Sequence, residues 1–392
     1  MTIRFQSIAV WLVGSALAIA WAAGMSFGDE AEPADRRAPN TRTPPALLLA
    51  SAEDALPADQ ADLLLLRSKI RACLHDYYKQ FDDVERREPW DILHAALAFG
   101  VDATVLSGGE PVNAIGWLCW NGPCRNQLLL GTDEHGLRAH RGPGVQGHAG
   151  QLLAVLAQSR VPTTYPLRVG TREFTVADLI RFEQETCDSS GDNTFKLLGL
   201  SFYLDTDETW TNRMGETWSV ERLLASELNQ PIDRGAACGG THRLMSLSYA
   251  VARRKRQGEP VESHWRRAEQ TIDQFHNYAF AFQNDDGSFS TNWFTRRGDD
   301  HGLAKRLFTT GHTLEWLAFS LPKDELTSPP VAHAVDYLAA MLREHADELW
   351  NPGPRGHALH ALAIYNERVF GSHPGDRAAF LNPTDSTGSS RR

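Results

Sequence analysis

A six-fold internal repeat constrains this chain more than any other feature of its sequence. The template H-x-x-x-x-L-[A/S] occurs four times, beginning at His148, His242, His312 and His357. Two further segments, beginning at Ile92 and Phe195, fit the same spacing without the histidine. The six segments recur at intervals of about 45 to 70 residues, which leaves room for one helix-loop-helix unit per repeat plus insertions.

The segments between the templates have a different pattern. They carry an apolar stripe at spacings of three and four residues with charges on the opposite face, as a half-exposed helix does, over residues 61–81, 175–187, 219–230, 262–283 and 329–349. The template segments are apolar or small nearly all round, which is typical of buried helices. We therefore predict an all-α fold, an α/α toroid of about six helical hairpins with an inner and an outer ring. Residues 113–131 and 165–176 alternate and turn like small β-hairpin insertions.

Helical geometry then predicts what each inner helix shows to the centre. Template positions are counted here as residues after the histidine. At 100° per residue, positions three and seven lie on the same side of the helix as the histidine, while the leucine at position five points away. Position three is occupied by Ala95, Gln151, Leu198, Met245, Glu315 and His360. Position seven is occupied by Phe99, Val155, Phe202, Tyr249, Phe319 and Ile364. We expect a polar level that contains the histidines, above an apolar floor.

Imidazole serves as acid, base or metal ligand near neutral pH, so this level is the candidate site. His312 and Glu315 form the clearest pair, because i,i+3 spacing places them on one helix face. The candidate catalytic residues are His312, Glu315, His242, His357 and His148. The candidate substrate-binding residues are Trp316, Arg243, Gln151, His360 and Tyr249. The alternative is that these histidines cap helix ends or fill polar gaps in a crowded interior.

The same level contains residue types that bind zinc, namely Cys238, His242, His312, Glu315 and His357. No compact metal-binding spacing such as C-x-x-C or H-E-x-x-H occurs. The sequence therefore leaves open whether a metal or any other cofactor is bound.

Three phrases carry family resemblances. Gln283 to Phe289, QNDDGSF, resembles the Q-W repeat of terpenoid cyclases and protein prenyltransferases, which implies a structural tie from an outer helix to the next loop. DTDET, from Asp205 to Thr209, is similar to the acidic signature of those cyclases, with Asp207 as the matching acid, but glutamate replaces its last aspartate. GHTLEW, from Gly311 to Trp316, resembles a motif of the N-acylglucosamine 2-epimerase family, which implies histidine and glutamate acid-base chemistry on a sugar. Together, CGGTHRL, QNDDGSFS and TTGHTLEW resemble a poorly characterised bacterial family of exported toroid proteins.

The ends of the chain indicate export. An early cation and an apolar run predict a signal peptide or signal anchor over residues 1–28, which would place the domain in the periplasm or outside the cytoplasmic membrane. A Pro- and Ala-rich linker over 29–58, a toroid domain over 59–370 and a disordered tail over 371–392 complete the organisation. In an oxidising compartment Cys119 and Cys124 could form a disulfide; unpaired thiols are the alternative.

Composition narrows the function. The net charge is −10 with no basic stripe, so a nucleic-acid partner is not expected. The first hypothesis is an exported or membrane-anchored enzyme, a glycan hydrolase, lyase or epimerase, that acts on a carbohydrate or another small molecule by histidine and glutamate chemistry. The first alternative is a non-catalytic envelope binding or scaffold module. The second is a protein similar to terpenoid cyclases and prenyltransferases.

Overall fold

The computed structural model describes residues 60–189, 191–232 and 237–371 of the chain. Within them the chain forms twelve α-helices, two short 3-10 helices and nine short strands. None of the helices among these residues is both long enough and apolar enough to cross a bilayer. The predicted signal segment, the linker and the tail beyond Gly371 lie outside the described residues.

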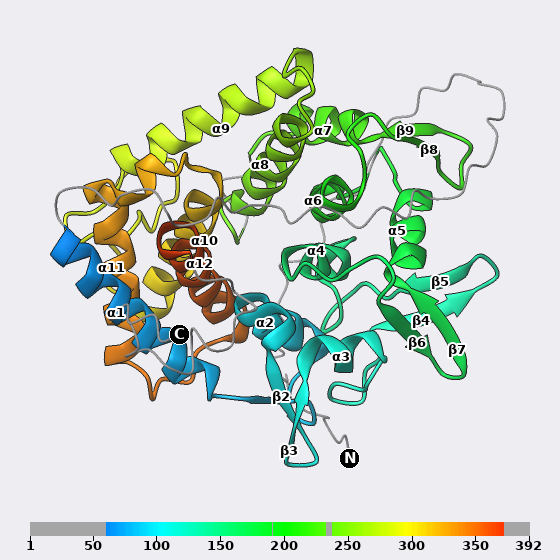
Figure 1. Cartoon of the computed structure of the whole chain (residues 1–392), viewed down its shortest axis with the longest axis horizontal. Helices are drawn as coiled ribbons and strands as arrows, with labels where there is room; N and C mark the ends of the chain where they lie inside the picture. The colour runs from blue at the N-terminus through cyan, green and yellow to red at the C-terminus, as the bar shows by residue number, and fades with distance from the viewer. Residues whose placement is uncertain (1–59, 190, 233–236, 372–392) are drawn as a thin grey trace, which may run out of the picture. The chain divides into compact units, whose positions relative to one another are not determined.

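Six buried helices contact one another in a fixed order. They are α2 (Pro89–Phe99), α4 (Gln151–Gln158), α6 (Thr194–Tyr203), α8 (Thr241–Arg256), α10 (Leu303–Ser320) and α12 (Pro352–Phe370). Each packs against the next in chain order, and α12 packs in turn against α2 (Figure 1). Each of the six predicted template segments contributes one of these helices.

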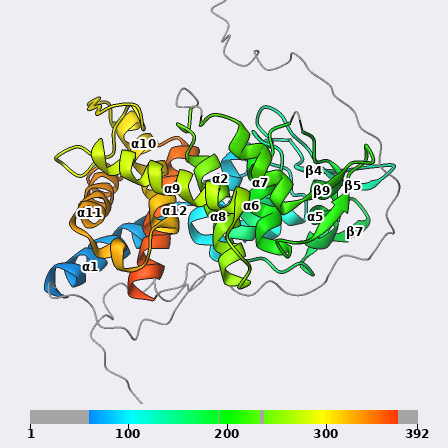
Figure 2. The ribbon, with the colours of Figure 1, turned by 90° about the horizontal axis from the view of Figure 1, so that it is seen from above.

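Five longer or more amphipathic helices pack against these six. They are α1 (Gln60–Tyr78), α5 (Val176–Glu185), α7 (Val220–Asn229), α9 (Ser263–Ala281) and α11 (Pro329–Glu344). The helix α9 runs beside α8 and α7, and α11 lies against α1 and α10 (Figures 1 and 2). All five correspond to segments whose apolar stripe predicted a half-exposed helix.

Local sequence signals explain where several helices begin and end. Pro89 opens α2, and Asp91 accepts a hydrogen bond from the backbone N–H of Glu88. The helix α12 begins after Asn351, whose side-chain oxygen accepts from the Gly353 N–H, and ends at Gly371 in the left-handed conformation, φ 76°.

Strands form small antiparallel pairs between the helices. The segment 165–176 forms the predicted hairpin of β6 (Pro166–Val169) and β7 (Arg172–Thr175). The prediction for 113–131 was wrong in its first part, because α3 (Ala114–Cys119) is helical and is capped by the Asn113 side chain. Further pairs join β2 (Thr104–Ser107) to β3 (Glu110–Asn113), β4 (Leu130–Asp133) to β5 (Gly136–Ala139), and β8 (Thr209–Thr211) to β9 (Thr217–Ser219). A two-residue strand, β1 (Asp82–Asp83), pairs with β2, and η1 (Gly100–Asp102) and η2 (Asp324–Thr327) are the 3-10 turns.

The six side chains that were expected to form an apolar floor are buried. All six side chains at template position seven are at least nine-tenths buried. The rings of Tyr249 and Phe319 stack with centroids 3.9 Å apart. The contact packs the middle of α8 against the C-terminal end of α10.

Candidate active site

Three histidines from three buried helices converge. His242 lies in the first turn of α8, His312 in the middle of α10 and His357 in the second turn of α12. One ring nitrogen of each lies within 4.8 Å of the others, and the Nε2 atoms of His242 and His357 are 3.4 Å apart. We call these three residues the histidine cluster. Four template histidines were expected at one level, and three of them form its centre.

Glycines beside the histidines allow this convergence. A Cβ on Gly311 would lie 3.0 Å from the Cα of Ala358, and a Cβ on Gly356 would lie 2.4 Å from the carbonyl oxygen of His94. A side chain does not fit at 2.4 Å, so Gly356 must be glycine for α12 to lie this close to α2, while the contact at Gly311 is tight and a side chain there would require α10 and α12 to shift by a few tenths of an ångström. The helix α8 begins instead after Gly240, in the left-handed conformation with φ 87°. Glycine thus stands just before histidine for two reasons: close helix packing at Gly311 and Gly356, and the left-handed turn that begins α8 at Gly240.

Glu315 of α10 orients two histidines of α12 by hydrogen bonds. Its two carboxylate oxygens accept hydrogen bonds from Nδ1 of His357, at 2.7 Å, and from Nδ1 of His360, at 2.6 Å. Burial alone would raise the pKa of Glu315, but the two histidines outweigh it and hold that pKa well below its usual range. The carboxylate is therefore ionised and holds both imidazoles by Nδ1, which leaves Nε2 of each ring turned away from it.

The predicted pairing of His312 with Glu315 is wrong. Nδ1 of His312 donates instead to the carbonyl oxygen of Phe308, 2.8 Å away and four residues back in the same helix. A helical side chain leans toward the N-terminus, so this carbonyl is nearer to the ring than a group one turn ahead. Glu315 reaches across to α12, a contact that i,i+3 spacing cannot reveal.

The deeper rings of the site are neutral. Burial, followed by the neighbouring imidazoles of His357 and His242, lowers the pKa of His312 well below its ordinary value. Burial and His148 lower the pKa of His242 to about 4. A fourth ring, His94 of α2, lies 5.2 Å from the ring of His357, and burial lowers its pKa to about 3. The sequence analysis missed His94, because it stands two residues from the template position that Ile92 occupies.

A histidine-carboxylate pair borders the neutral rings. Nδ1 of His148, which precedes α4, lies 2.5 Å from a carboxylate oxygen of Asp192, and the His148 ring centroid is 5.9 Å from that of His242. Burial acts to lower the pKa of His148, but Asp192 outweighs it and the pKa is raised. Burial raises the pKa of Asp192, but bonds to His148 and Thr194 hold it at about 2. Asp192 lies in a loop whose sequence has no motif, so its role could not be predicted.

A small cavity opens beside the cluster. Four of the candidate residues line it: Gln151, His242, Glu315 and His357. Leu198 and Met245, also from template position three, and Phe195 complete much of the wall. Its free space of about 20 Å³ suits one water-sized ligand.

Four candidate substrate-binding residues do not line this cavity. Trp316 is fully buried, and its Nε1 donates to the hydroxyl of Ser248 at 3.1 Å. The guanidinium of Arg243 pairs with Glu227 at 2.9 Å. Tyr249 belongs to the floor, and His360 reaches the site only through Glu315.

Side-chain hydrogen bonds hold the loop from Gln283 to Phe289. Nε2 of Gln283, at the end of α9, donates to the carbonyl oxygens of Gly287 and Pro330, each at 2.9 Å. Asp286 accepts from the hydroxyl of Ser288 at 2.6 Å and from Arg306 at 2.7 Å.

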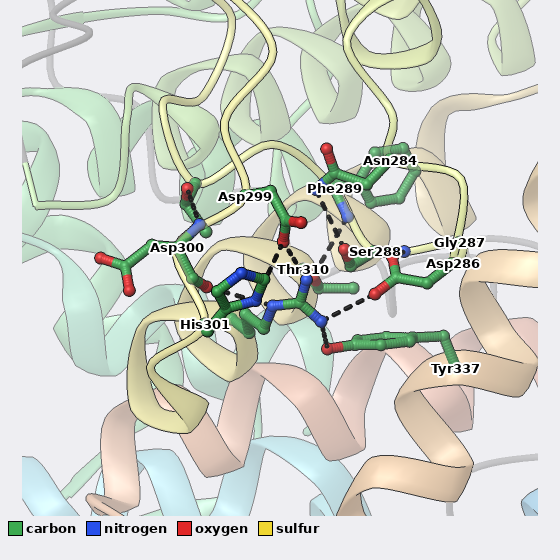
Figure 3. A network of polar contacts seen from close by, with 12 residues as sticks. Asn284, Asp286, Gly287, Ser288, Phe289, Asp299, Asp300, His301, Thr310 and Tyr337 are labelled. Atoms are coloured by element: carbon green, nitrogen blue, oxygen red, sulfur yellow. Dashed lines mark hydrogen bonds and ion pairs between the residues drawn. The ribbon is translucent and has the colours of Figure 1, made fainter.

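Arg306 of α10 joins this loop to Tyr337 of α11. Figure 3 shows Asp286, Asp299 and Tyr337 around its guanidinium group.

The acidic phrase DTDET does not reach the cavity. Asp207 lies in an exposed turn before β8 and pairs with Arg254.

The cysteines carry no bridge among the described residues. Cys73, Cys119, Cys124, Cys187 and Cys238 are all free thiols, so the bridged form expected for Cys119 and Cys124 is not observed. Burial raises the pKa of Cys119 to about 12 and that of Cys124 to about 11. Both thiols are therefore protonated and unreactive at neutral pH.

No protein family, curated protein or solved structure matches the chain significantly. The function must therefore be argued from the site alone.

Proposed function

We propose that the protein is an exported α/α-toroid enzyme that acts on a carbohydrate by histidine-carboxylate acid-base chemistry in its central cavity. The toroid is supported by the contact order of the buried helices, in which each packs on the next and α12 packs on α2. It is also supported by the five amphipathic helices that pack against them. In a toroid, the histidine cluster would lie in the central lumen that the six buried helices surround.

One observation carries the acid-base proposal: two histidine-carboxylate hydrogen bonds belong to one cluster of rings. His357 is fixed by Glu315, and His148 by Asp192, with the ring of His242 in contact with both histidines. A carboxylate on Nδ1 leaves Nε2 of the imidazole aimed at a reacting group, as in a general acid or base. The two environments differ, because the side chain of His148 is 42% exposed whereas His357 and His312 are buried. Such a difference separates a proton donor from a proton acceptor.

The carbohydrate class is supported by less direct observations. The predicted export segment places the domain where envelope glycans occur, and the GHTLEW phrase resembles a sugar-epimerase motif. Many α/α barrels act on glycans, an argument from fold analogy.

A binding module without turnover is the second candidate, and the size of the cavity favours it. A free space of about 20 Å³ does not hold a sugar ring, so an enzyme of this kind must bind its substrate at the mouth, near His148, or widen on binding. The terpenoid alternative loses its acidic residue, because Asp207 is exposed and paired with Arg254.

A matched pair of variants tests the enzyme proposal. The purified full chain is incubated with a panel of envelope glycans and oligosaccharides, and products are detected by mass spectrometry. His148→Asn should lower kcat by about 10²- to 10⁴-fold on any glycan that the wild type converts. His264→Asn is the control, since His264 also lies beside a carboxylate, Glu221 at 3.3 Å, but is exposed on α9.

Two outcomes contradict the proposal. Full turnover by His148→Asn would remove that residue from the chemistry. Glycan binding without turnover by the folded wild type would favour the binding module.

A further inference from the structure

The histidine cluster has a geometry that acid-base chemistry does not require. Three imidazoles from α8, α10 and α12 bring one ring nitrogen each within 4.8 Å of the others, although no helix contributes more than one of them. Acid-base work needs one ring with a free nitrogen. Three convergent rings place three lone pairs together, which is costly unless a cation lies between them.

Hydrogen bonding fixes which nitrogens face one another. Nδ1 of His357 donates to Glu315, and Nδ1 of His312 donates to the Phe308 carbonyl oxygen, so Nε2 of each ring carries a lone pair. Nε2 of His242 stands 3.4 Å from Nε2 of His357. If His242 carries its proton on Nδ1, two lone pairs face each other.

The opposite tautomer of His242 does not remove the conflict. A proton on Nε2 would be shared across 3.4 Å and would leave Nδ1 as a buried acceptor, and that atom has no hydrogen-bond partner. Either way, one nitrogen of this ring is unsatisfied in the structure. A metal ion bound to the three Nε2 atoms resolves the contact between His242 and His357.

From this geometry we propose that His242, His312 and His357 form a binding site for a divalent transition metal, preferentially Zn²⁺. Nitrogens bound to one zinc ion at about 2.0–2.1 Å in tetrahedral geometry stand roughly 3.3–3.4 Å apart. The observed separation for His242 and His357 agrees with that value. The third nitrogen lies within 4.8 Å and needs a shift of at most about 1.5 Å to complete the set.

The surroundings agree with this assignment. Glu315 on Nδ1 of His357 and the Phe308 carbonyl on Nδ1 of His312 are the usual second partners of metal-bound imidazoles, since they fix the tautomer and make Nε2 more basic. Neutral imidazoles suit zinc and related transition metals more than Mg²⁺ or Ca²⁺, which take oxygen ligands. The ionised Glu315 also offsets part of the charge of a buried dication.

Three protein ligands leave a tetrahedral ion with one open position. Structural zinc sites use four protein ligands, while catalytic sites use three and keep a position for water or substrate. The cavity beside His242 and His357 has room for one water-sized ligand. A role of this ion in turnover rests on the proposed function, whereas its binding is measured without turnover.

The test uses the untagged full chain, stripped with a chelator and titrated with Zn²⁺ and, separately, Co²⁺. We expect about one ion per chain, a rise in Tm with Zn²⁺, and the visible absorption of Co²⁺ in a tetrahedral nitrogen site. His242→Gln and His312→Gln should each abolish the Co²⁺ absorption. Glu315→Gln should keep the stoichiometry but weaken affinity by about 10- to 100-fold.

His276→Gln is the matched control, since it replaces an imidazole on α9 that bonds to Ser320 outside the cluster. It should bind as the wild type does. The proposal is overturned if the folded wild type binds no stoichiometric metal, or if His242→Gln binds as tightly as the control. Zinc binding without glycan turnover would refute the proposed enzyme alone, and turnover by the fully stripped protein would refute a catalytic role for the ion.

Discussion

The helices α12 and α2 approach closely at Gly356, and this contact gives a sharp prediction for Gly356→Ala. A Cβ at this position would lie 2.4 Å from the carbonyl oxygen of His94 and 3.0 Å from its carbonyl carbon. These are backbone atoms, so they cannot rotate away, and the helices must separate by several tenths of an ångström or more. Overpacking of this kind costs about 1–3 kcal/mol, and more where the backbone itself must move.

Helix propensity acts in the opposite direction. Replacing glycine by alanine inside a helix gains about 1 kcal/mol when the site is open. The clash should exceed this gain, and we expect Gly356→Ala to lower the free energy of unfolding by about 1–2 kcal/mol net. A shift of α12 would also move His357 within the histidine cluster, so zinc affinity should fall with stability.

Gly116→Ala is the control for this prediction. Gly116 is also helical, in α3, but an added Cβ would meet nothing closer than 3.4 Å, an ordinary contact. It should be neutral or slightly stabilising, by up to about 1 kcal/mol. Urea unfolding followed by tryptophan fluorescence measures both variants. If Gly356→Ala proves as stable as Gly116→Ala, the close contact between α12 and α2 is not present in solution.

Three further predictions concern charged groups. The pKa of Asp192 is held at about 2 against an unfolded value near 3.8, so its contribution is present above about pH 4 and is lost as the pH falls toward 2. Asp192→Asn should therefore flatten the acid limb of a stability-pH profile and lower the pKa of His148 seen by NMR. Lys196→Met should destabilise the fold by about 3–5 kcal/mol in thermal unfolding, since it leaves the buried carboxylate of Glu183, 3.3 Å away, without a counter-charge; adding Glu183→Leu should recover most of that loss. Arg306→Gln should release the loop before α10, and faster amide hydrogen exchange confined to that loop would be the sign; unchanged exchange would show that the ion pairs do not order it.

Much of the helical organisation could be predicted because it follows from the spacing of apolar residues within short segments. Leucine and a small residue five and six positions after Ile92, His148, Phe195 and the three cluster histidines mark one buried helix each. The apolar stripes between them mark the outer helices. The positions of the histidines within their helices were less predictable: α10 begins nine residues before His312, at Leu303, so this histidine does not open its helix.

The polar contacts of the site could be predicted only in part, because they join distant segments. Glu315 of α10 bonds to His357 and His360, which both lie on α12. The sequence of α10 alone cannot show whether Glu315 bonds to α12 or to His312 of its own helix. Asp192 contacts His148 from a loop, where backbone direction is set by tertiary packing. Trp316 does not line the cavity: its indole N–H donates to Ser248 of α8, and its ring lies against His276 of the outer helix α9.

The packing of α12 between α10 and α2 also constrains how the protein is made. Until that helix has followed the others out of the ribosome or translocation channel, apolar flanks of both its neighbours remain uncovered. The nascent chain must therefore be kept from associating with itself through nearly all of its synthesis. A chaperone that holds unfinished chains, or delivery of the polypeptide unfolded to the far side of a membrane, would meet that need.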